Sequence, residues 1–203
     1  MNNKPKLFSN KPETTILLIR HGETDWNTEG RLQGNEDIEL NDKGRAQAHE
    51  IAEYLKKEQW DMIISSPLKR AYETAIIISK AIDIKEIIII EEFKERDYGA
   101  ASGLLPEERR SRYPDIIPGQ EEFEHLRQRA MNGLNKVIEK YNGKKIIIIS
   151  HGGLINSILY TLSNAEYGSF KTRLKNGCIN KIIFNNSWNV EFYNKTIEEL
   201  ISK

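Results

Sequence analysis

The amino-acid sequence predicts an α/β fold: a three-layer α/β/α sandwich with a mostly parallel central sheet and a C-terminal hairpin. Short apolar runs alternate with segments whose apolar residues recur at helical intervals, which is typical of a parallel sheet covered by helices. Two runs, residues 16–19 and 146–149, consist only of Ile and Leu. Such continuous apolar runs are expected of strands that are buried on both faces.

The length of the chain favours a single domain. Its 203 residues are enough to bury a full hydrophobic core. We expect this domain to span residues 14–203. Residues 1–13 have no hydrophobic period and are interrupted by Pro5 and Pro12, so a flexible N-terminal tail is expected there.

Composition excludes several classes of protein. Thirty basic residues balance thirty acidic ones, so nothing indicates binding to nucleic acid or to a charged membrane surface. The single cysteine, Cys178, excludes an intramolecular disulfide and fits a reducing compartment. The apolar runs are far shorter than the ~18 residues of a membrane span. We therefore expect a cytoplasmic protein, and a homodimer is compatible with the sequence.

Apolar runs separated by turn residues predict the strands. The parallel strands are expected at residues 14–19, 61–65, 86–93 and 145–149. Two further runs, 180–184 and 190–193, flank the turn sequence Asn185-Asn186-Ser187 and predict the hairpin. Residues 22–40 are polar and contain glycines, so an irregular loop is expected over the end of the first strand.

Apolar residues at intervals of three and four predict helices between these strands. Asn41 is a good N-cap for the first helix, and Ser66-Pro67 are expected to cap and start the second. Residues 121–141 and 154–162 predict two more helices. Four helix breakers fall within residues 100–119, for which we expect a short helix inside a mobile excursion: Pro106, Pro114, Pro118 and Gly119.

Charged side chains follow the predicted strands. Arg20 and His21 come directly after the first strand and His151 after the fourth, while Arg70 lies early in the helix after the second. Open α/β sheets bind ligands at the carboxyl ends of their strands. Two guanidiniums and a histidine there would suit a dianionic phosphoryl group, because Arg binds phosphate oxygens through a bidentate fork. These cationic side chains would form a phosphate-binding cup, and the backbone N–H groups of a helix that starts at Gly152 would add further donors to it.

The same residues suggest phosphoryl transfer. A neutral His21 with its free nitrogen toward phosphorus would be a nucleophile, and a phosphohistidine would divide a difficult displacement into two easier steps. Glu95, just past the third strand, is the candidate to protonate the leaving oxygen and later to accept a proton from water. This scheme requires no cofactor and no metal ion, and the sequence has no HExxH or DxD motif, so neither is predicted.

These residues lie in four ordered motifs that resemble those of the histidine phosphatase superfamily, the phosphoglycerate-mutase-like group. Residues 18–27 resemble its signature, and residues 65–75, 93–99 and 150–153 resemble its second, proton-donor and last motifs. The resemblance implies that His21 is phosphorylated. It implies a catalytic set of His21, Glu95, His151, Arg20 and Arg70. The residues expected to bind phosphate or substrate are Arg20, Asn27, Gln33, Gly34, Arg70, His151 and Gly152.

The segment after Glu95 separates the branches of this group. The mutase branch carries a long insert, whereas residues 100–118 are short here. Residues 118–123 resemble a stretch of small-molecule phosphatases, from which they depart at Gln120 and Glu122. We therefore predict a histidine acid-type phosphatase, a metal-independent phosphomonoesterase acting on a small phosphorylated metabolite. A cofactor-dependent phosphoglycerate mutase and a phosphate-reading binding module without turnover are the alternatives.

Some charged residues have competing interpretations. A solvated face is the commoner role for a run of charges, but Arg109, Arg110 and Arg112 would also be able to bind a second anionic group of the substrate. His49 and His125 are surrounded by charged residues on predicted helices, which indicates surface positions. Cys178 is expected to be a small packing residue.

Overall fold

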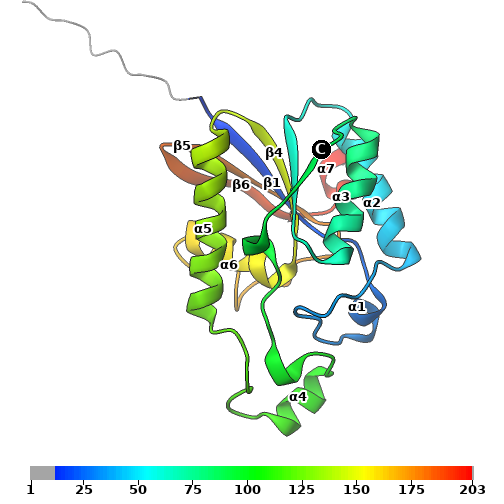
Figure 1. Ribbon diagram of the computed structural model, residues 1–203, viewed down its shortest axis with the longest axis vertical. Helices are drawn as coiled ribbons and strands as arrows, with labels where there is room; N and C mark the ends of the chain where they lie inside the picture. The colour runs from blue at the N-terminus through cyan, green and yellow to red at the C-terminus, as the bar shows by residue number, and fades with distance from the viewer. Residues whose placement is uncertain (1–11, 203) are drawn as a thin grey trace, which may run out of the picture.

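A six-stranded sheet runs through the protein in the order β3-β2-β4-β1-β5-β6 (Figure 1). The structure is a computed structural model that describes residues 12–202, so the predicted tail lies almost wholly outside the described residues. The four parallel strands are β1 (Thr14–Arg20), β2 (Met62–Ser65), β3 (Ile87–Ile89) and β4 (Lys145–Ser150). The antiparallel strands β5 (Ile179–Asn185) and β6 (Ser187–Lys195) form the C-terminal hairpin. The predicted fold class is confirmed.

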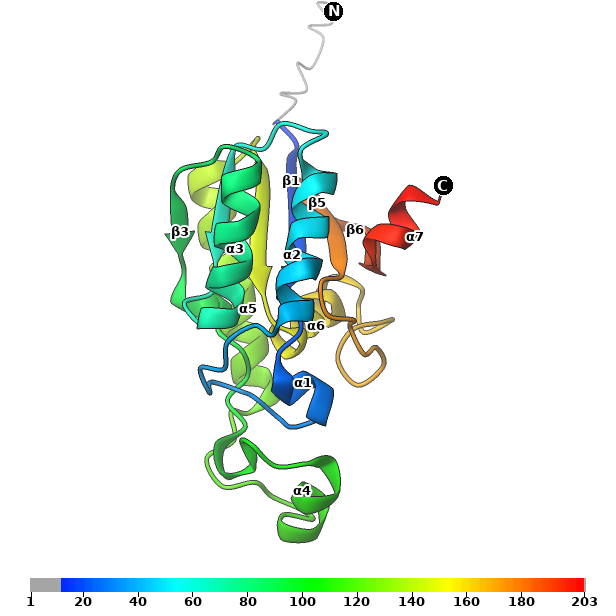
Figure 2. The same ribbon diagram turned by 90° about the vertical axis from the view of Figure 1, so that its right-hand side faces the viewer.

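Helices cover both faces of the sheet, as Figure 2 shows. Alternate residues of β1 supply two separate cores, because successive side chains of a strand point to opposite faces. Ile16 and Leu18 pack with α5 (Phe123–Tyr141) and α6 (Gly152–Leu162). Leu17 and Ile19 pack with α2 (Asp42–Leu55), α3 (Lys69–Ala81) and α7 (Ile197–Ile201). Each fully buried Ile or Leu contributes roughly 1.5–3 kcal/mol, so these cores hold the strands firmly.

The register of β1 and β4 places their carboxyl ends side by side. Ile19 pairs with Ile149 and Arg20 with Ser150. The His21 N–H then donates to the Ser150 carbonyl at 3.0 Å, which carries the pairing one residue past β1. The chain therefore leaves both strands at the same point of the sheet edge.

Several predicted boundaries are wrong. The third strand ends at Ile89 instead of residue 93, because a 3-10 turn, Glu91–Phe93, follows it. The loop after β1 contains the short helix α1 (Asp25–Glu29), which Thr24 caps, and α7 follows the hairpin; neither helix was predicted. The helix after β2 starts at Lys69, with no side-chain cap, instead of at Pro67.

The excursion after residue 99 contains the expected short helix. It comprises a 3-10 turn, Gly99–Ala101, and α4 (Pro106–Arg112). Backbone hydrogen bonds join it to the loop after β1: Gly103 N–H donates to Leu32 O at 2.7 Å, and Leu32 N–H donates to Leu104 O. Both views show α1 and α4 beyond the carboxyl ends of the strands. Within residues 12–202, no helix is long and apolar enough to cross a membrane.

Candidate active site

A cavity of about 400 Å³ lies at the carboxyl edge of the parallel strands. Eight of the predicted site residues line it: Arg20, His21, Asn27, Gln33, Gly34, Arg70, Glu95 and Gly152. His151 adjoins them, with its ring centroid 5.1 Å from that of His21. Residues that lie far apart in the sequence therefore meet at the edge where the strand pattern predicted a site.

His21 is held as a neutral ring with one free nitrogen. Its Nδ1 lies 2.6 Å from the Gly22 carbonyl, which only accepts, so Nδ1 carries the proton. Nε2 then has the lone pair, and it accepts from Arg70 Nε at 3.2 Å. Burial, followed by Arg70 and Arg20, holds the pKa of His21 well below its usual range. The unprotonated form that a nucleophile needs is thus the stable one here.

Arg70 is fully buried beside His21. Its Nη1 donates to Glu36 O and its Nη2 to Gly34 O, both at 2.7 Å. Burial lowers the Arg70 pKa to about 10, so the guanidinium remains charged at neutral pH. The loop after β1 therefore fixes the orientation of this cation.

His151 presents its other nitrogen to the cup. Ser66 Oγ lies 2.7 Å from His151 Nε2 and also accepts from the Leu68 N–H. When the Ser66 hydroxyl donates to Nε2, His151 carries its proton on Nδ1, and that buried nitrogen has no hydrogen-bond partner among the described residues. This use of Ser66 is why it does not cap α3. Burial and the neighbouring Arg70 hold the His151 pKa well below its usual range.

Arg20 supplies a second buried donor without an acceptor. Its Nη1 donates to Leu174 O at 2.6 Å, whereas its Nε is buried and unpartnered within the described residues. A Cβ on Gly152 would lie 3.3 Å from that Nε, so glycine allows the guanidinium to lie against the start of α6. Buried donors normally have partners, and the oxygens of an anion in the cavity would satisfy both Arg20 and His151.

Glu95 occupies the N-terminus of α6. Its Oε2 accepts from the Gly153 N–H at 3.0 Å, while Oε1 accepts from the N–H groups of Leu154 and Arg96. We expected the backbone N–H groups at the start of α6 to bind phosphate. Two of them, those of Gly153 and Leu154, instead donate to the Glu95 carboxylate. Because Oε2 accepts a single hydrogen bond, it is the oxygen with room for a proton.

Asn27 lines the cavity, and Asn176 supports it through a hydrogen bond. Asn27 Oδ1 accepts from Asn176 Nδ2 at 2.9 Å and from Thr24, which leaves the Asn27 amide N–H groups for a ligand. Asn176 also lies within hydrogen-bond distance of the His21 and Gly22 carbonyls. No sequence signal indicated Asn176, because it belongs to a loop that reaches the site only through the fold.

The outer part of the cavity is lined by other residues than expected. Arg31 and Arg173 line it, together with Tyr98, Asn156 and Thr172. The three arginines of α4 do not: Arg110 and Arg112 are exposed, and Arg109 is half-buried outside the cavity. Their exposure agrees with the solvated face that a run of charges more commonly forms, and not with the alternative of a second anion site. Burial raises the pKa of Cys178 to about 11, in agreement with a packing role.

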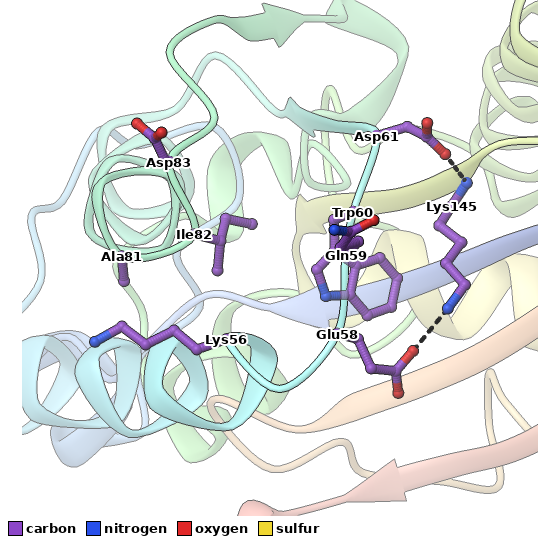
Figure 3. A pocket seen from close by; sticks show the side chains of 9 residues that line it. All are labelled: Lys56, Glu58, Gln59, Trp60, Asp61, Ala81, Ile82, Asp83 and Lys145. Carbon is purple, nitrogen blue, oxygen red and sulfur yellow. Dashed lines mark hydrogen bonds and ion pairs between the residues drawn. The ribbon is translucent and has the colours of Figure 1, made fainter.

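A larger cavity lies at the opposite edge of the sheet, where β2 and β4 begin. It has a volume of about 750 Å³, and Figure 3 shows Lys145 in it, pointing toward Glu58. Its lining includes no histidine or arginine, so it offers neither a histidine nucleophile nor a guanidinium to bind phosphate. Among residues 12–202, no cluster of three or more His, Cys, Asp or Glu side chains could hold a metal ion.

Comparison with known proteins decides the family. A sequence model of the histidine phosphatase superfamily (branch 1) matches residues 16–196. The chain belongs to this superfamily. A phosphatase is the class of enzyme that this membership and the names of the relatives support.

Three relatives of this histidine phosphatase illustrate the likeness. A Bacillus subtilis protein, the uncharacterized phosphatase PhoE, is 45% identical over 183 residues, covering 89% of this chain and 94% of the relative. A metal-independent phosphoserine phosphatase of Arabidopsis thaliana is 36% identical over 183 residues, covering 83% and 76%. The phosphoserine phosphatase of Entamoeba histolytica, solved with 3-phosphoglyceric acid, superposes with a TM-score of 0.78 at 31% identity and covers 92% and 99%.

Proposed function

We propose that this protein hydrolyses a small phosphorylated metabolite through a phosphohistidine on His21. The observation that carries the proposal is the unprotonated Nε2 of a buried, neutral histidine, beside two guanidiniums and two buried nitrogens without partners among the described residues, Arg20 Nε and His151 Nδ1. Such a group of donors suits the oxygens of a phosphoryl group, whose transfer requires mainly positioning and charge stabilisation.

The first step forms a bond between His21 Nε2 and phosphorus and breaks the ester P–O bond. In the free protein the Arg70 Nε–H donates to His21 Nε2. In the substrate complex this N–H would instead donate to a phosphoryl oxygen. The donors of Arg20 and His151 would bind the other oxygens. A proton from Glu95 Oε2 would go to the leaving alcohol oxygen.

The second step returns the enzyme to its starting state. Water would attack the phosphorus of phosphohistidine, the N–P bond would break, and Glu95 would accept a proton of that water. Inorganic phosphate would leave with neutral His21 restored. Among the described residues that line the cavity, Glu95 is the single carboxylate, so it serves both steps.

The outer part of the cavity favours a substrate with a second negative charge. Four arginines line the cavity against one glutamate. Arg173 is exposed and its side chain makes no hydrogen bond or ion pair within the described residues, whereas Arg31 is held by Glu29 and the Gly103 carbonyl. A dianionic phosphate together with a carboxylate would balance this charge. Two relatives named phosphoserine phosphatase support such a substrate.

The test is inorganic phosphate release, in the presence of EDTA, from a panel of alkyl phosphates with and without a carboxylate. The panel includes phosphoserine, glycerol 2-phosphate and 3-phosphoglycerate, the last with and without 2,3-bisphosphoglycerate. Rapid release from carboxylate-bearing esters is expected. Isomerisation of primed 3-phosphoglycerate with little phosphate release would instead identify a mutase. Phosphate binding without turnover of any ester would identify a binding module.

A further inference from the structure

The loop that carries Glu95 has no strand partner. After β3 ends at Ile89, the backbone passes through a 3-10 turn and continues as an irregular segment to residue 99. Backbone carbonyls buried away from water need hydrogen-bond partners. Here side chains provide them, since Ser150 Oγ donates to Phe93 O at 2.8 Å.

One arginine of α5 holds the rest of this loop. Arg129 Nη1 donates to the carbonyls of Glu92 and Lys94, at 2.8 and 2.9 Å, and its Nη2 donates to the carbonyl of Glu95 at 3.2 Å. Nε and Nη2 also donate to the two carboxylate oxygens of Glu121, at 2.9 and 2.8 Å. A guanidinium has five N–H donors, so Arg129 uses all of them on this loop and on Glu121.

Arg129 and Glu121 do not reach the substrate cavity. They line a separate cavity of about 330 Å³, and Glu95 lines both cavities. An effect of Arg129 or Glu121 on the reaction would therefore pass through the loop that carries Glu95, to which Glu121 also bonds directly at the Asp97 N–H. The loop also packs closely on α5, because a Cβ on Gly133 would lie 2.9 Å from the Phe93 ring.

We propose that Arg129, oriented by Glu121, is the positioning residue that holds Glu95 where it can exchange a proton with the substrate. The inference rests on the acid–base role given to Glu95 above. Because a shift of about 1 Å in a reacting group can cost ~100-fold in rate, the three hydrogen bonds of Arg129 to the loop carbonyls matter for catalysis as well as for folding.

The same helix offers a matched control. Arg127 forms a two-pronged ion pair with Glu124, through Nε at 2.8 Å and Nη2 at 2.6 Å. This pair resembles that of Arg129 and Glu121 in chemistry, but among the described residues Arg127 makes no hydrogen bond to the carbonyls of residues 92–95, so its loss should leave Glu95 in place.

The test compares two esters in Arg129→Lys, Glu121→Gln and Arg127→Lys. Lysine keeps the charge of Arg129 but cannot hold three carbonyls and a carboxylate at once. For Arg129→Lys and Glu121→Gln we expect kcat/KM on glycerol 2-phosphate to fall by about 10- to 100-fold, and that on p-nitrophenyl phosphate by less than about threefold, because the aryl leaving group needs little acid assistance. Arg127→Lys should change neither. Using two variants keeps the test decisive if one of them does not fold.

A double mutant separates this inference from the function on which it rests. In a Glu95→Gln background, Arg129→Lys should add little further loss on the alkyl ester, because residues that act through one group are not additive. Equal losses on both esters, or a full additional loss in that background, would overturn the positioning role. Equal losses on both esters in Glu95→Gln alone would instead overturn the acid–base role of Glu95.

Discussion

The two histidines and Glu95 reach the same cavity by different structural routes. His21 and His151 directly follow neighbouring strands whose backbones are hydrogen-bonded in register. Glu95 lies beyond the end of β3, on an irregular loop held by Arg129 and Ser150. The proposed nucleophile is therefore positioned by the sheet itself, whereas the backbone that carries the proposed proton donor is positioned by side chains from other elements.

Because they are positioned differently, the two parts of the site should respond differently to mutation. The histidine pair is buried among strand ends, so a change there removes a reacting group without moving the backbone. The backbone position of Glu95 depends on a few side chains that hold the loop carbonyls, so it can be lost through changes outside the cavity.

Removal of the nucleophile should cause the greatest loss. His21→Ala is expected to lower phosphate release roughly 10⁴-fold or more on alkyl and aryl esters alike, since an essential nucleophile has no substitute. The measurement is turnover together with acid-quench trapping of labelled phosphoenzyme. His49→Ala, which alters an exposed histidine of α2, is the control. A labelled phosphoenzyme trapped in His21→Ala would show that another residue is the nucleophile.

Loss of the proton donor should depend on the leaving group. Glu95→Gln preserves shape and should slow alkyl esters by ~10²–10⁴-fold and p-nitrophenyl phosphate much less. Steady-state kinetics on both esters provide the measurement, and Glu91→Gln, at an exposed position on the same loop, is the control. A Glu95→Gln variant that is equally slow on both esters would contradict the assignment.

The buried neutral histidines should also make stability depend on pH. The pKa values of His21 and His151 are lowered in the folded state, so between those values and about 6.5 the unfolded chain binds more protons. The free energy of unfolding should therefore fall as pH falls from 7.5 to 5.5. Each histidine contributes at most ~1.4 kcal/mol per pH unit.

Urea unfolding at these two pH values provides the measurement. His151→Gln should reduce the slope, whereas His125→Gln, at an exposed position of α5, should not. Carboxylates with lowered pKa values, such as Asp61 and Glu92, lose their contribution only below about pH 5 and lie outside this window. Equal stability at pH 7.5 and 5.5 would contradict the burial of both rings in neutral form.

The smallest effect is expected at the rim of the cavity. Arg173→Ala should raise KM for a carboxylate-bearing phosphate by about 2- to 5-fold with little change in kcat, because an exposed cation contributes about 1 kcal/mol or less. Arg110→Ala, on the face of α4 outside the cavity, is the control. If KM for this substrate is the same in both variants, Arg173 does not bind the substrate carboxylate.

The sequence carried enough information to predict the strand-end half of the site. Continuous apolar runs identify buried parallel strands, and residues that directly follow such runs meet at one edge. The residues around Glu95 were not predictable in this way. Arg129 has the pattern of a residue on the polar face of a helix, and its five acceptors are specified only by how α5 packs on the loop.

Tertiary contacts also determine the structure at positions where local sequence patterns gave the wrong prediction. Ser66 has the sequence of a helix cap, but its hydroxyl is used on His151, and the helix starts later. The charged run on α4 was a candidate for binding the substrate, yet the fold turns it away and brings Arg173 from the loop before β5. Short patterns cannot distinguish such outcomes, because the partner lies far away in the chain.

The position of Glu95 between two cavities has a pharmacological consequence. The cavity of about 330 Å³ that Glu121 and Arg129 line lies outside the phosphate cup. A compound bound there would disturb proton transfer without competing for the phosphoryl group, so raising the substrate concentration would not relieve its inhibition. Such a compound would also avoid the strongly cationic cup, for which inhibitors need a high negative charge that hinders their entry into cells.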